Sequence, residues 1–159
     1  MKGKFFGATM LVIVLALVLA VPASAGKPPP PAGPITVTVG SWSYKNICAK
    51  GICQMATDVT ARGITWSNAS AANHLIAGLY ICDVGTAPGP GMGEGCVNWT
   101  ERYRQSITAT QGKLPSKNFT VEWSECYDYY PAILLVNVTD SQTEVLARAL
   151  GPKIAGFCF

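Results

Sequence analysis

The chain has 159 residues, of which 49% are hydrophobic and 13% are charged, and its formal net charge is +3. Lys2 and Lys4 fall in a segment that we expect to be removed, so 10 of the 12 basic residues face 9 acidic ones in the remainder. A chain so close to neutrality gives no electrostatic argument for binding nucleic acid or an anionic membrane.

Residues 1–25 have the pattern of a secretory signal peptide. Two early lysines precede a continuous apolar run over residues 10–21, and an Ala-Ser-Ala cleavage motif occupies residues 23–25. The alternative is an uncleaved anchor, since residues 5–21 approach the roughly 18 apolar residues that span a bilayer. The cleavage motif favours removal, so we expect a secreted, extracellular protein with no membrane attachment after cleavage.

Residues 26–34 contain five prolines and predict an extended, polyproline-like spacer. Residues 35–159 are long enough for a single domain with its own core. The predicted organisation is therefore a signal peptide, a Pro-rich spacer and one domain.

All six cysteines lie after the signal peptide. An even number of cysteines in an exported domain indicates disulfides, although fifteen pairings of six cysteines are possible in principle. Spacing favours two short local loops, Cys48 with Cys53 and Cys82 with Cys96, which leaves Cys126 for Cys158.

Residues 35–39 alternate strictly between apolar and polar side chains and predict the first strand. Residues 41–50 lead into the Cys48–Cys53 unit, and residues 52–60 and 63–67 are two further β-rich segments. Their expected core members are Met55, Val59, Ile64 and Trp66.

The Cys48–Cys53 pair has a spacing that could also hold a metal ion. A tetrahedral site needs a second pair of ligands, and the single histidine, His74, is distant in sequence. We therefore expect a disulfide across a tight turn and no metal. His74 is expected at the solvent end of a strand.

Residues 67–73 are small and polar and predict a loop, and residues 74–84 form the next strand. That strand contains Cys82 and leads into a segment rich in Gly and Pro, which excludes regular structure as far as Cys96. The Cys82–Cys96 disulfide would close this loop, around which we expect the domain to be organised.

Residues 97–110 carry Trp99, Tyr103 and Ile107, and residues 118–124 are the most regular predicted strand. In that strand the odd-numbered Phe119, Val121 and Trp123 are expected to face the core. The intervening polar side chains face water: Asn118, Thr120, Glu122 and Ser124.

Residues 125–131 are expected to form an aromatic loop, and residues 132–138 a strongly apolar strand. Residues 141–150 begin with a capping-box pattern, so a short helix and a strand are both open there. Residues 153–159 predict a terminal strand. Short strands at this spacing, without alternating helices, predict an all-β antiparallel sandwich.

Four Asn-x-Ser/Thr motifs are possible glycosylation sites, and each needs a surface position if it carries a glycan. They lie at Asn68, Asn98, Asn118 and Asn137.

The order of features from residue 35 onward resembles the neocarzinostatin-like domains, which are immunoglobulin-like apoproteins of enediyne antibiotics, and their secreted actinobacterial relatives. The resemblance covers about two thirds of the chain after the signal peptide. It rests on Ala77-Gly-Leu-Tyr-Ile-Cys82, the Gly/Pro loop to Cys96, Asn118-Phe-Thr-Val121, Ser124-Glu-Cys126 and the end of the chain at Phe159. The Cys48–Cys53 pair and a Cys126–Cys158 bridge depart from the family pattern.

The resemblance implies an immunoglobulin-like antiparallel β-sandwich stapled by disulfides. It also implies a cleft floored by the Cys82–Cys96 loop that shelters an aromatic small molecule, held by stacking and desolvation. The alternative is that these aromatic residues bind no ligand and are ordinary core and surface residues of the sandwich. The residues that would line the cleft are Trp99, Tyr103, Tyr127, Tyr129 and Tyr130.

We therefore expect a secreted, non-catalytic binding protein without a cofactor, whose partner is a small aromatic ligand or an extracellular protein. The alternative is a structural or adhesive subunit that self-assembles by donating residues 35–39 to a neighbour's sheet edge. A hydrolase is disfavoured, because a Ser-His-Asp triad would have to use His74 and no Gly-x-Ser-x-Gly turn exists. An acid pair among Glu122, Glu125 and Asp128 is the remaining catalytic alternative.

Overall fold

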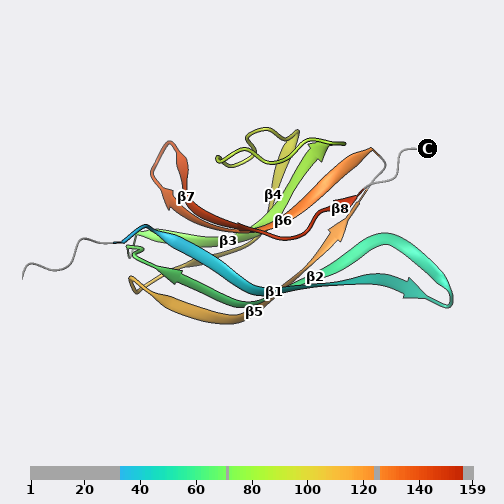
Figure 1. Cartoon of the computed structure of the whole chain (residues 1–159), viewed down its shortest axis with the longest axis horizontal. Helices are drawn as coiled ribbons and strands as arrows, with labels where there is room; N and C mark the ends of the chain where they lie inside the picture. Colours follow the sequence, from blue (N-terminus) through green and yellow to red (C-terminus); the bar gives the residue numbers. More distant parts are fainter. Residues whose placement is uncertain (1–32, 71, 124–125, 156–159) are drawn as a thin grey trace, which may run out of the picture. The chain divides into compact units, whose positions relative to one another are not determined.

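A computed structural model of the chain describes residues 33–70, 72–123 and 126–155 (Figure 1). The predicted signal peptide, most of the Pro-rich spacer, Glu125 and Cys158 lie outside these residues. The described part contains eight strands and no helix. Accordingly, it holds no helix of the length and hydropathy needed to cross a membrane.

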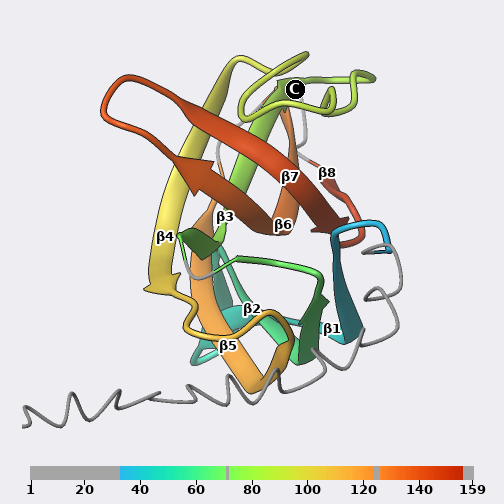
Figure 2. The same ribbon diagram turned by 90° about the vertical axis from the view of Figure 1, so that its left-hand side faces the viewer.

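Two antiparallel sheets pack face to face (Figures 1 and 2). In the three-stranded sheet the order is β1 (Thr36–Ala49), β2 (Ile52–Ser67), β5 (Gly112–Glu122). In the five-stranded sheet the order is β4 (Asn98–Ser106), β3 (Asn73–Asp83), β6 (Tyr127–Val138), β7 (Thr143–Leu150), and β8 (Ile154–Ala155) pairs with the start of β6.

This strand order confirms the predicted all-β antiparallel sandwich. The connections β2–β3, β4–β5 and β5–β6 each pass from one sheet to the other, whereas β1–β2 and β6–β7 are hairpins. The fourth strand, β4, pairs with β3 in the larger sheet. In constant-type immunoglobulin domains the fourth strand belongs to the opposite sheet.

The central strands β3 and β6 are buried on both faces, which explains their nearly continuous apolar sequence. Odd-numbered residues such as Leu75 and Ile133 face the three-stranded sheet and form the inner core. Even-numbered residues such as Ile76 and Leu134 face the other way and form an outer core. The irregular loop between β3 and β4 packs on this outer face through Met92 and Cys96 (Figure 1).

In the three-stranded sheet, the set of residues that face inward switches between odd and even numbers at one cross-strand row. We call this switch a phase change. On one side of the row the inward residues of β1 are Val37 and Val39, and on the other they are Trp42 and Tyr44. The pairing of β1 with β2 keeps the same register from Thr36 to Asn46. The phase change falls at Gly40 in β1, Gly63 in β2 and Pro115 in β5, and Gly63 has a φ of 63°.

Two predicted breaks in the smaller sheet are wrong for this reason. Residues 52–60 and 63–67 belong to one strand, because the ladder to β1 continues past the kink at Gly63. Residues 41–49 likewise continue β1. Met55, expected in the core, is 45% exposed because the end of this hairpin extends beyond the sandwich (Figure 1).

Two predicted elements near the end of the chain are also corrected. The expected aromatic loop is strand from Tyr127 onward, because its residues pair with the end of β3 and with β8. The helix considered for residues 141–150 is wrong. The Thr139 amide donates to the Gln142 carbonyl at 2.9 Å, which closes a tight turn, and β7 then pairs along β6.

The predicted loop at residues 84–96, the β3 strand and the inward face of Phe119 and Val121 are confirmed. So are two disulfides, Cys48–Cys53 and Cys82–Cys96, and the first excludes metal binding by that pair. Cys126 is disulfide-bonded, and its expected partner lies outside the described residues. Two intramolecular disulfides indicate an oxidising, extracellular-type environment.

Candidate functional site

The five aromatic residues expected around the Cys82–Cys96 loop do not share one surface. Trp99 and Tyr130 pack on the outer core together with both cysteines of the disulfide. Tyr103 packs on the inner core instead. Tyr127 and Tyr129 also lie between the sheets, near Val59 and Val121.

A β-bulge in β4 explains the separation of Trp99 from Tyr103. Trp99 pairs with the outward Tyr80, and Tyr103 pairs with the inward Ala77. Arg102 is the extra residue between them, since Gly78 pairs with Glu101. The two aromatic residues are four apart in sequence, so regular alternation would have placed them on the same face.

The surface above the Cys82–Cys96 disulfide is filled by the protein's own side chains. The Trp99 and Tyr80 rings meet edge to face with centroids 4.7 Å apart. The indole also lies directly on Gly78, where a Cβ atom would come within 2.5 Å of the ring. Burial raises the pKa of Tyr80, and the nearby Arg148 guanidinium opposes the rise.

Hydrogen bonds from the larger sheet hold the loop on this outer core. The Tyr130 hydroxyl donates to the Thr86 carbonyl at 2.9 Å, and the Tyr80 hydroxyl donates to the Gly91 carbonyl at 3.1 Å. Arg148 donates to the carbonyls of Pro88 and Gly89. The loop is therefore a fixed cover, and its underside is packed core.

The residues considered for catalysis are dispersed. His74 is half-buried in β3, and its Nδ1 is a buried nitrogen that has no hydrogen-bond partner in the described part. Glu122 is exposed, and Glu125 lies outside the described residues. Asp128 is 1% exposed and accepts hydrogen bonds from the Gly85 amide at 2.9 Å and the Lys153 ammonium at 3.1 Å. Its contacts are those of a structural carboxylate.

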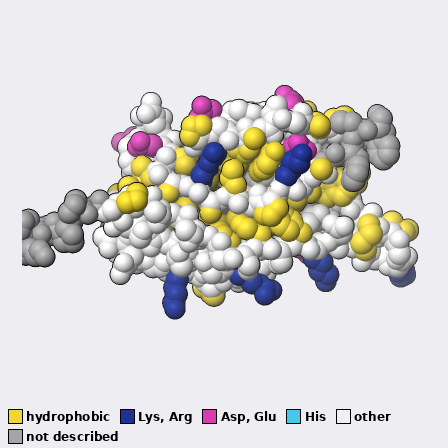
Figure 3. Space-filling model, in the orientation of Figure 1, with side chains coloured by type: hydrophobic (Ala, Val, Ile, Leu, Met, Phe, Trp, Pro, Cys, Tyr) yellow, Lys and Arg dark blue, Asp and Glu magenta, His cyan; other side chains and the backbone are white. Residues whose placement is uncertain are grey.

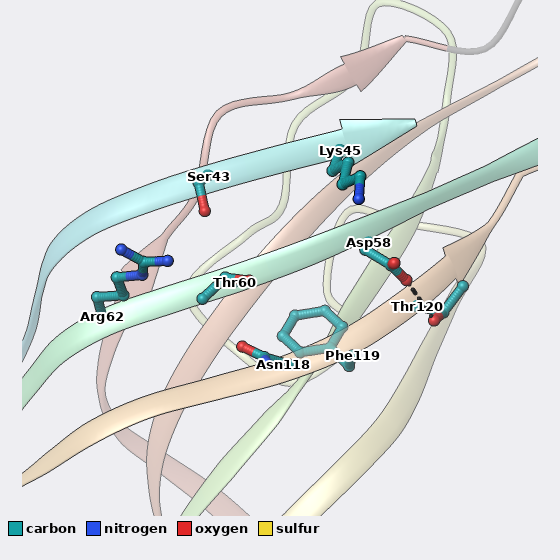
Figure 4. Close-up of a pocket in the computed structure, with 8 residues that line it drawn as sticks. All are labelled: Ser43, Lys45, Asp58, Thr60, Arg62, Asn118, Phe119 and Thr120. Carbon is teal, nitrogen blue, oxygen red and sulfur yellow. Dashed lines mark hydrogen bonds between the residues drawn. The ribbon is translucent and has the colours of Figure 1, made fainter. Parts of the chain in front are cut away.

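A hollow of about 410 Å³ lies instead on the three-stranded sheet (Figure 4). This volume is within the range of small-molecule sites in proteins. Most of the lining side chains are polar and project from the solvent face of the sheet, whereas Phe119 is partly buried against the core. The lining residues are Ser43, Lys45, Asp58, Thr60, Arg62, Asn118, Phe119 and Thr120.

Cross-strand pairing arranges these side chains in rows. In one row Asp58 of β2 lies between Lys45 of β1 and Thr120 of β5. In the next row Thr60 lies between Ser43 and Asn118. Arg62, two residues further along β2, begins a third row.

The acidic side chain of the hollow has a hydrogen-bond partner, whereas its two basic side chains have no salt-bridge partner among the described residues. The Thr120 hydroxyl lies 2.7 Å from Asp58 Oδ1 and donates to it. Within the described ranges, neither Lys45 nor Arg62 takes part in a salt bridge. On the face shown in Figure 3, several Lys and Arg side chains line the border of the three-stranded sheet, and others lie beside Asp and Glu side chains on the larger sheet.

Most residues of this site were not predicted from the sequence. Asn118 and Thr120 were expected on the solvent face of their strand, which is confirmed. The other two strands carried a similar signal in the polar residues that alternate through residues 41–45 and 58–62. Which strands lie side by side was the missing information.

The four glycosylation motifs differ in exposure. Asn68, Asn98 and Asn118 are exposed, and Asn137 is half-buried. The Asn68 amide donates to the Pro34 carbonyl at 2.9 Å. Use of these motifs stays a prediction.

Comparisons of the chain with family models, with characterised proteins and with solved structures gave no match.

Proposed function

We propose that this protein is a secreted, non-catalytic binding protein that holds a hydroxyl-rich small molecule, of the saccharide class, in the hollow of the three-stranded sheet. The observation that carries the proposal is the set of cross-strand rows. They present three hydroxyls, an amide and three charged groups around one concavity.

Such rows suit a ligand with many hydroxyl groups. Neighbouring strands lie about 4.8 Å apart, and alternate residues along a strand about 6.6 Å apart. The backbone of the sheet thus fixes the spacing of the polar groups. Less conformational entropy is therefore lost when a ligand binds to them. Each net hydrogen bond contributes only about 0.5–1.5 kcal/mol, so several must act together.

We place the ligand here rather than above the Cys82–Cys96 loop. The enediyne-type cleft of the neocarzinostatin-like domains needs aromatic walls that face one space. The bulge at Arg102 puts Tyr103 on the face opposite Trp99, and Met92 packs on the outer core beside the disulfide. An aromatic ligand at that position would have to displace the loop.

A structural or adhesive subunit is the second candidate. The end of the β1–β2 hairpin projects from the sandwich and exposes Ile52, which is 75% accessible, and Met55. Assembly by donation of the first strand is less favoured, because β1 already pairs along its length with β2. Cross-linking of the secreted protein would give a ladder of oligomers if this candidate were correct.

The binding proposal is tested by titrating the protein, without its signal peptide, with neutral oligosaccharides and following backbone amide NMR shifts. We expect shifts confined to β1, β2 and β5 around the hollow, and weakened binding in Thr60→Val, which removes a central hydroxyl. Thr110→Val, at an exposed position outside the hollow, is the matched control. Shifts centred on the loop between β3 and β4, or no shifts, would contradict the proposal.

A further inference from the structure

We infer that the ligand of the hollow is an acidic saccharide whose carboxylates are bound by Lys45 and Arg62. This inference rests on the proposed function and adds the charge of the ligand to it. The evidence for it is the net positive charge of the side chains that line the hollow and the positions of the two basic ones.

The hollow presents net positive charge to a ligand. Two basic side chains and one acidic side chain line it, and the acid already accepts a hydrogen bond from Thr120. Lys45 and Arg62 have no salt-bridge partner among residues 33–70, 72–123 and 126–155. Their donors therefore remain available to an anionic group, and an Arg guanidinium suits a planar carboxylate in particular.

The two cations stand at opposite ends of the hollow, as Figure 4 shows, with Ser43 and Thr60 between them. Lys45 pairs across from Asp58, and Arg62 lies four residues further along β2. At about 3.3 Å per residue, this places the two rows roughly 13 Å apart. A ligand that satisfies both cations carries acidic groups toward its two ends, with sugar hydroxyl groups between them.

An acidic oligosaccharide has this arrangement. Its ring hydroxyls would face the neutral row, where Thr60 lies between Ser43 and Asn118. Its carboxylates would face Lys45 and Arg62. Because the hollow is open to water, salt should weaken the charged contacts and spare the neutral ones.

The experiment compares two matched probes, trigalacturonate and neutral galactotriose, by isothermal titration calorimetry at low and high salt. We expect trigalacturonate to bind about tenfold more tightly at low salt, as charge-assisted hydrogen bonds exceed neutral ones in strength. Lys45→Gln and Arg62→Gln should each lose much of this preference, and circular dichroism of each variant shows that it is folded. Lys113→Gln, which removes the same charge from an exposed position outside the hollow, is the matched control.

The possible outcomes distinguish a failure of this inference from a failure of the proposed saccharide-binding function. If both probes bind equally well, the acidic ligand is refuted and the saccharide site stands. If neither probe binds, the proposed function is refuted together with the inference. If Lys113→Gln weakens trigalacturonate as much as Arg62→Gln does, the attraction is a general charge effect and the assignment of Lys45 and Arg62 is overturned.

Discussion

Glycines provide the space for three tryptophan side chains. A Cβ atom at Gly78 would lie 2.5 Å from the Trp99 ring, and one at Gly112 would collide with the Trp66 ring. At Gly151 a Cβ atom would meet both the Trp42 ring and the Tyr44 hydroxyl. Each indole is thus positioned by the absence of a side chain beneath it.

Tyr44 is the residue whose ionisation should be visible in the stability of the fold. Its hydroxyl donates to the Pro152 carbonyl at 2.9 Å, and burial raises its pKa to about 12. In the unfolded chain the pKa of a tyrosine is about 10. Between these values the unfolded state loses the proton first, so the free energy of unfolding falls as pH rises from about 10 to about 12.

Tyr44→Phe should remove this part of the alkaline loss of stability. At neutral pH the variant loses one partly exposed hydrogen bond, which costs about 0.5–1.5 kcal/mol. Chemical unfolding of both proteins at neutral and alkaline pH measures the effect. If the variant and the parent lose the same stability on going to alkaline pH, Tyr44 is not the group responsible.

At the scale of elements, two irregularities decide which side chains share a face. The kink at Gly40, Gly63 and Pro115 reverses the alternation of three strands at once. The bulge at Arg102 reverses it in one strand only. Because of the kink, even-numbered residues of β2, including Thr60, face the hollow, whereas on the other side of the kink Ile64 faces the core.

Gly63→Ala should test the kink. Gly63 has a φ of 63°, where a residue with a Cβ atom is strained by about 1–2 kcal/mol. Gly40→Ala is the matched variant, because Gly40 sits in the same row without a positive φ and its nearest contact would be 3.4 Å from the new Cβ. Urea unfolding should show a larger loss for Gly63→Ala, and equal losses would contradict the strained kink.

The sequence predicted side-chain faces correctly where a strand is regular, and it gave no sign of the bulge. Alternation through residues 118–123 gave the correct face for Phe119 and Val121, because β5 is regular on that side of the kink. The resemblance implied a cleft lined by both Trp99 and Tyr103, which needs the two rings on one face. The bulge between them puts the rings on opposite faces, and it leaves no clear mark in the residue types. The aromatic cleft depended on that face assignment, and the hollow depended on the pairing of strands distant in sequence.

In the molecule as a whole, one of the two described disulfides is part of a hydrophobic core and the other lies outside both cores. Cys82–Cys96 lies in the outer core, with Cys82 fully buried. Cys48–Cys53 joins exposed residues beside the turn of the projecting hairpin. One cross-link therefore secures the cover of the larger sheet, and the other secures an arm outside it.

Replacing Cys82 and Cys96 together by alanine should cost about 3 kcal/mol by the chain-entropy account of a loop of this length. The corresponding Cys48 and Cys53 double variant should lose less global stability, because the freed segment can fray without exposing either core. Denaturant unfolding of the two double variants measures the difference. The reverse order would show that the projecting hairpin is integral to the folded core.

The bulge at Arg102 has a consequence for changes in chain length. Deleting one residue between Trp99 and Tyr103 would restore regular pleating and rotate one of the two rings out of its packing site. The turn at residues 139–142 joins two strands at an exposed surface, where an inserted residue alters no packed side chain. Insertions and deletions should therefore accumulate in that turn and be selected against in β4.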